Sequence, residues 1–122
     1  MESRELNQML ISNFPNLQDK YNDEVSWQNG DSTGSHIVYG DVFTPYLVEC
    51  ITSKNVQEIK KAFNFLEKIL SLKNKYSDEV VAFSVVESIV YLLEKDDYLK
   101  SFLGDMTNVI FKEITDFVHG GR

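Results

Sequence analysis

Residues 55–72, NVQEIKKAFNFLEKILSL, carry the clearest structural signal in this chain. Apolar residues recur there at alternating steps of three and four, which is the spacing of one face of an α-helix. Two such stripes run side by side: Val56, Ile59, Phe63, Leu66 and Leu70, and next to them Ala62, Phe65, Ile69 and Leu72. So wide an apolar face predicts a helix that packs against two neighbours, with its lysine-rich opposite side in water.

The next stretch, residues 80–93, is apolar almost all round and predicts a helix at the centre of the domain. Its many β-branched residues are also typical of a strand, but the length of the run and a capped start favour a helix. Ser77 is expected to be that cap. A narrow polar strip interrupts the helix and consists of Ser84, Glu87, Ser88 and Tyr91.

Further helices are expected on both sides of these two. Asp105 is expected to cap a last helix, whose buried face would consist of Val109, Ile110, Phe111, Ile114, Phe117 and Val118. Pro45 lies within another apolar pattern. Either Thr44 caps a helix that begins at Pro45, or one longer helix from His36 is kinked there, and we expect a break or a kink.

These elements predict an all-α protein: an irregular bundle or short α-solenoid-like array of about six to seven helices. The 122 residues suit a single domain. Within it we expect an N-terminal helical hairpin over residues 1–27, a loop rich in turn residues over 28–35, and the main helical core over 36–122.

Composition narrows the function classes. A net charge of −7 argues against nucleic acid as the main partner, and no apolar run is long enough to span a membrane. The single cysteine excludes an internal disulfide, and we expect a cytoplasmic protein. The charge is uneven: residues 52–76 hold six bases and two acids, whereas the segments before and after them are both acidic. This distribution indicates a polarised surface.

Catalytic groups are scarce, so we expect a protein that is not an enzyme and has no cofactor. His36 and His119 are the only histidines, and neither stands at a recognisable spacing from a nucleophile. Cys50 lies on an apolar stripe and is expected to be buried and inert. We find no phosphate-binding glycine loop and no spacing typical of a zinc or calcium site.

Three glutamates stand inside apolar stretches: Glu49, Glu67 and Glu87. Because a buried, unpaired carboxylate is costly, each is expected to face solvent or to take part in a helix–helix hydrogen bond. Two carboxylates brought together could instead perform acid–base chemistry or bind a metal, which keeps a small metal- or carboxylate-dependent enzyme as an alternative.

Tyrosines beside small residues and carboxylates are typical of protein interfaces. On this basis the candidate partner-binding residues are Trp27, Asp41, Tyr46, Glu49, Glu87 and Tyr91. The competing interpretation is that the aromatic members complete the core and leave only their polar tips in water.

Four segments resemble a family of small, uncharacterised helical proteins of bacteria: VYGDVFTPYLVE (residues 38–49), FNFLE (63–67), VVESI (85–89) and YLKSFLG (98–104). Such proteins are similar in size and style to immunity proteins that neutralise polymorphic toxins. The resemblance is strongest over residues 36–107 and implies no catalytic residue. It implies a protein partner, such as a basic toxin domain, that an acidic inhibitor would attract over a distance. A self-associating scaffold module is the third hypothesis.

Overall fold

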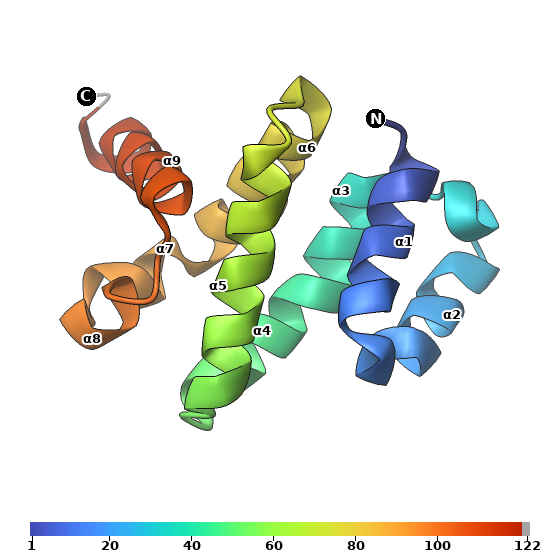
Figure 1. The fold of residues 1–122 in the computed structure, drawn as a ribbon, viewed down its shortest axis with the longest axis horizontal. Coiled ribbons are helices and arrows are strands. Elements are labelled where there is room, and N and C mark those ends of the chain that lie inside the picture. Colours follow the sequence, from blue (N-terminus) through green and yellow to red (C-terminus); the bar gives the residue numbers. More distant parts are fainter. Residues whose placement is uncertain (121–122) are drawn as a thin grey trace.

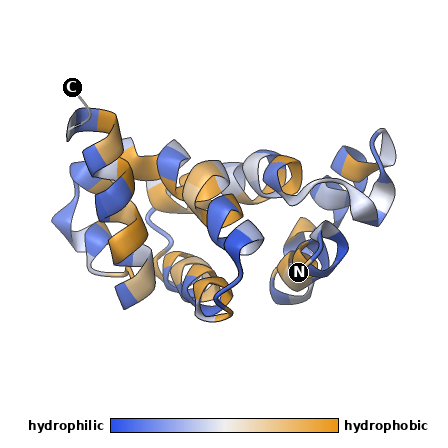
Figure 2. Cartoon of the chain, turned by 90° about the horizontal axis from the view of Figure 1, so that it is seen from above, coloured by the Kyte–Doolittle hydropathy of each residue, from blue (hydrophilic) through white to orange (hydrophobic). Residues whose placement is uncertain are grey.

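The computed structural model describes residues 1–120, which form seven helices and no strand. The prediction of an all-α architecture of six to seven helices is confirmed. The helices follow one another roughly in chain order along the long axis of the molecule, from α1 and α2 at one end to α8 and α9 at the other (Figure 1). Hydrophobic and hydrophilic residues share almost every helix, so the helices are amphipathic (Figure 2).

The elements have the following bounds. They are α1 (Ser3–Asn13), η1 (Pro15–Leu17), α2 (Gln18–Ser26), η2 (Gly30–Ser32), α3 (Ser35–Val38), η3 (Tyr39–Phe43), α4 (Thr44–Thr52), α5 (Val56–Ser71), α6 (Lys75–Glu79), η4 (Val80–Val86), α7 (Glu87–Glu94), α8 (Asp97–Lys100), α9 (Asp105–Thr115) and η5 (Asp116–Gly120). The segments η3, η4 and η5 are π-helical turns that continue the α-helix before them. As a result, α3 to α4 and α6 to α7 are two long, uninterrupted helices.

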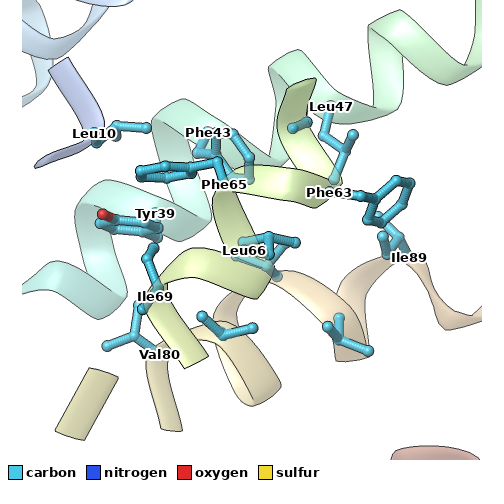
Figure 3. Close-up of a cluster of buried hydrophobic side chains, with 14 of the residues drawn as sticks. Leu10, Tyr39, Phe43, Leu47, Phe63, Phe65, Leu66, Ile69, Val80 and Ile89 are labelled. Carbon is cyan, nitrogen blue, oxygen red and sulfur yellow. The ribbon is translucent and has the colours of Figure 1, made fainter. Parts of the chain in front are cut away.

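Helix α5 lies at the centre of the array, and more helices pack against it than the two predicted: it contacts α4, α9 and, through α6 and η4, the second long helix. The side chain of Asn55 caps it by accepting a hydrogen bond from the backbone N–H of Glu58. Its apolar face supplies much of the core, including Phe63, Phe65 and Leu66 (Figure 3). Leu72, the last member of the second stripe, is instead exposed.

The N-terminal helices are held by aromatic packing and by buried polar contacts. The ring of Phe14 lies 5.4 Å from that of Phe43 and 5.3 Å from that of Phe65, which joins α1 to η3 and α5. Asn7 is fully buried, and its side-chain amide donates to the carbonyl oxygens of Thr33 (2.7 Å) and Asp31 (3.2 Å). The segment between α2 and α3 is therefore fixed against α1 by specific hydrogen bonds.

Helix starts differ from two of the sequence predictions. Ser77 is not a cap, because the central helix begins at Lys75 and the side chain of Asn74 accepts the backbone N–H of Ser77 at 3.1 Å. Asp105 is the first residue of α9 rather than its cap. Both predicted residues do lie at a helix start. The free backbone N–H groups are bound instead by Asn74 at α6 and by Glu67 at α9.

Pro45 does not break its helix. The helix runs on from Ser35 to Thr52, and the π-helical turn η3 lies immediately before Pro45. A proline ring clashes with the carbonyl four residues earlier in a regular α-helix, and a wider turn at that point relieves the clash. Among residues 1–120, no helix has the length and apolarity needed to cross a lipid bilayer.

Candidate functional site

Four of the six predicted binding residues lie on two neighbouring helices. Asp41 and Glu49 belong to η3 and α4, whereas Glu87 and Tyr91 belong to α7, and all four are exposed. The hydroxyl of Thr44 donates to the carbonyl oxygen of Ser84 at 2.7 Å and joins the two helices. The first of these long helices contacts α5 through α4 and the second through α6 and η4. We call Asp41, Glu49, Glu87 and Tyr91 the acidic face.

The remaining two candidates lie elsewhere. Trp27 follows the last residue of α2 in the N-terminal hairpin and is 71% exposed. Tyr46 is half-buried, with its ring edge-on to Phe14 at 6.0 Å and its hydroxyl donating to Glu58. Burial and, to a smaller extent, this hydrogen bond raise the pKa of Tyr46. Tyr46 therefore links α4 to α1 and α5.

An apolar groove beside the acidic face was not predicted from the sequence. It has a volume of about 270 Å³ and lies between η4 and the last helix, lined by Ala82, Phe83, Ile110, Glu113, Ile114 and Phe117. Phe83 is 50% exposed and Phe117 is 72% exposed. We call this the phenylalanine groove.

The prediction of a buried face was therefore wrong at three positions of α9 and η5. Val109, Phe117 and Val118 are exposed. Phe111 and Ile114 are buried as expected. The predicted set covered more than one side of the helix, and only the stripe that faces α5 and η4 is covered. A signal was available in the sequence, since a single neighbour cannot bury two apolar stripes of one helix. Phe83 was missed for the same reason, in a helix that is apolar almost all round.

Glu67 makes the helix–helix hydrogen bonds expected of a glutamate in an apolar stretch. Its carboxylate accepts the backbone N–H groups of Met106 (3.0 Å) and Thr107 (2.9 Å) and the hydroxyl of Thr107 (2.8 Å). It therefore caps α9 from a different helix, at the end where the helix dipole favours a negative charge. Burial raises the pKa of the Glu67 carboxyl, but these hydrogen bonds outweigh burial and the net pKa is lowered. Glu67 is a structural anchor.

Metal-ligating side chains are dispersed in the described part of the chain, and Cys50 is buried. Among residues 1–120, no three His, Cys, Asp or Glu side chains come together in a way that could hold a metal ion. Cys50 is buried, and burial raises the pKa of its thiol, which disfavours the reactive thiolate.

The two histidines make single polar contacts. His36 Nδ1 lies 2.7 Å from the hydroxyl of Ser84, and its ring is edge-on to Tyr76 at 5.7 Å. His119 Nε2 lies 2.6 Å from the carboxylate of Glu94. Among residues 1–120, no carboxylate oxygen lies within 4.0 Å of the ring nitrogens of His36. The His36–Ser84 contact is a further link between the two long helices.

Comparison with protein families gave one match, which spans nearly the whole chain. The model described as "Domain of unknown function (DUF7674)" matches residues 7–120. Comparisons with curated proteins and with solved structures gave no match.

Proposed function

The chain belongs to the DUF7674 family, and we propose that it is a non-enzymatic domain that binds another protein through the phenylalanine groove and the acidic face. The observation that carries the proposal is the exposure of Phe83 and Phe117 on opposite walls of one groove. Contiguous exposed apolar surface with a polar rim is typical of protein interaction sites.

The charges around the groove favour a basic partner. Glu113 lines the groove itself, and Glu87 of the acidic face is exposed on the helix that carries Phe83. An apolar side chain of the partner would occupy the groove while basic side chains approach the carboxylates. Charge pairing of this kind mainly accelerates association and selects the partner, whereas the buried aromatic contacts supply most of the affinity.

Within this proposal, we favour an immunity-type inhibitor in the bacterial cytoplasm that covers a basic toxin domain. The support is the net charge of −7 together with the location of four predicted binding residues on two adjacent helices. A self-associating module would use the groove in the same way, and light scattering at two protein concentrations distinguishes the two.

The test is affinity capture of the tagged chain from its own cells, followed by binding kinetics with the captured partner. The double variant Glu49→Lys/Glu87→Lys should lower the association rate about tenfold or more at low salt, with helicity and melting temperature almost unchanged. Phe83→Ser/Phe117→Ser should mainly accelerate dissociation. A partner bound equally well by wild type and both variants would refute the proposed surface.

A matched control distinguishes the effect of charges at the proposed interface from the effect of the overall net charge on the association rate. Asp19→Lys/Asp23→Lys makes the same change in net charge on exposed residues of α2, outside both the groove and the acidic face. This control should retain an association rate within about twofold of wild type, because steering depends on charges near the interface. An equal loss in the control would mean that only the net charge matters.

A further inference from the structure

The exposed side of α5 forms a basic groove on an acidic protein. A hollow of about 420 Å³ lies between the end of α1 and α5, and it is lined by Asn13, Phe14, Gln57, Lys60, Lys61, Asn64, Phe65 and Lys68. No carboxylate belongs to this lining. We call it the lysine groove. It contains three of the six bases of the positive segment at residues 52–76.

Helix α5 contains two carboxylates, and both are engaged by other elements. Glu58 accepts the hydroxyl of Tyr46 on α4. Glu67 accepts the backbone N–H groups at the start of α9. Neither carboxylate lines the groove, and neither forms an ion pair with its lysines.

The lysines also lack ion-pair partners. In the described part of the chain, none of Lys60, Lys61 and Lys68 lies within 4.0 Å of a carboxylate oxygen. Two of them lie against aromatic rings instead: Lys61 Nζ lies 4.8 Å from the ring centre of Phe14, which lines the groove, and Lys60 Nζ lies 5.9 Å from that of Phe102, which lies outside the lining. Such contacts orient an ammonium group without neutralising it.

We propose that the lysine groove binds a small anion carrying several phosphate groups. The backbones of Lys61 and Lys68 are separated by about 10 Å along the helix, given a rise of 1.5 Å per residue, so an anion with several phosphate groups can contact both without their side chains converging. The side-chain amides of Asn13, Gln57 and Asn64 supply neutral donors between the cations. Ammonium groups and amide N–H groups together are typical phosphate ligands.

The size of the ligand follows from the surrounding charge. A long polyanion such as RNA would extend beyond the groove over the rest of a chain whose net charge is −7. A short oligophosphate stays within the reach of the three lysines. This site is independent of the phenylalanine groove, because it lies between α1 and α5 rather than beside η4.

The experiment is a titration of the ¹⁵N-labelled chain with inorganic tripolyphosphate, with orthophosphate at equal ionic strength as the reference. Backbone amides of residues 57–68 should shift in a saturable way with tripolyphosphate. Orthophosphate should bind at least about tenfold more weakly, since it reaches fewer cations. Equal binding of the two anions, or shifts spread over lysines outside the groove, would overturn the proposal.

Variants with matched charge complete the test. Lys60→Gln/Lys61→Gln/Lys68→Gln should raise the Kd for tripolyphosphate at least about tenfold, whereas Lys20→Gln/Lys95→Gln/Lys112→Gln, which removes the same charge elsewhere, should leave it within about twofold. Circular dichroism checks that both variants remain folded, and Lys68→Gln alone is the substitute if the triple variant is not. Equal affinities in the two triple variants, or binding of RNA or poly-glutamate without tripolyphosphate, would refute the site.

Discussion

The two ends of the molecule are attached to the same central helix in opposite ways. At the N-terminal end, Phe14 is fully buried in an aromatic cluster and Asn7 is fully buried in a hydrogen-bond network. At the C-terminal end, one carboxylate from α5 caps α9, while Phe83 and Phe117 remain exposed. The N-terminal end is thus held by buried aromatic and polar contacts, although Trp27 is exposed there, whereas the C-terminal end exposes two phenylalanines on one groove that a partner can cover.

The strongest test of this contrast compares two phenylalanines. Phe65→Ala should lower the free energy of unfolding by about 3–5 kcal/mol, because it opens a cavity in the aromatic cluster. Phe117→Ala should cost at most about 0.5 kcal/mol, because that side chain is largely in water already. Urea denaturation of both variants measures the difference. A large cost for Phe117→Ala would mean that the phenylalanine groove is closed in solution.

A second test addresses the polar network at the N-terminal end. Asn7→Ala leaves the carbonyl oxygens of Thr33 and Asp31 without this donor and removes one of the two acceptors of the Ser35 hydroxyl, the other being the carbonyl oxygen of Ser3. Each buried group left unpaired is costly, so we expect a loss of about 2–3 kcal/mol in the free energy of unfolding. Asn64→Ala on the exposed side of α5 is the control, and its effect should stay within about 0.5 kcal/mol. Equal effects of the two would argue against the network.

A third test removes the anchor of the C-terminal end and depends on pH. Glu67→Ala should cost about 1–2 kcal/mol at pH 7, the usual loss for a helix cap, and should accelerate hydrogen exchange at the start of α9. The folded-state pKa of Glu67 is lowered, so its contribution is complete above the unfolded pKa of about 4.3 and disappears as the pH falls through the folded value. The difference in free energy of unfolding between wild type and variant should therefore be smaller in acid. Urea denaturation of both proteins at pH 7 and at pH 3 measures this difference. A difference that is larger in acid would contradict this assignment.

The smallest effect concerns the glycine before α9. A Cβ atom added at Gly104 would lie 2.4 Å from the Glu67 carboxylate, which three hydrogen bonds hold in place. We expect Gly104→Ala to cost about 1 kcal/mol in wild type, with most of that cost absent in a Glu67→Ala background. A double-mutant cycle measures the coupling. Additive effects would mean that Glu67 moves aside freely.

The features that could be predicted from the sequence were those that depend on the local spacing of apolar residues. The spacing of apolar residues in 55–72 was sufficient for α5 and its solvated side, because a helix face depends on nearby residues. The number of helices that pack against α5 was underestimated. The capping of α9 could not be predicted, since Glu67 lies about 40 residues away in the chain. The exposure of Phe83 and Phe117 depends on where α9 crosses η4. The spacing of apolar residues within each helix does not determine that crossing point. For the candidate site, sequence reasoning selected residues that lie on adjacent helices but missed the groove beside them.

The π-helical turn η4 determines where this helix can change in length. An α-helix turns by about 100° per residue, and a π-helical turn holds one extra residue within nearly the same total rotation. Deleting one residue within Val80–Val86 would let the helix return to regular α geometry and leave Glu87, Ile89 and Tyr91 pointing in nearly their present directions. A deletion within Glu87–Glu94, where the helix is regular, would instead turn every later residue by about 100°. Relatives whose central helix differs in length should therefore differ at η4.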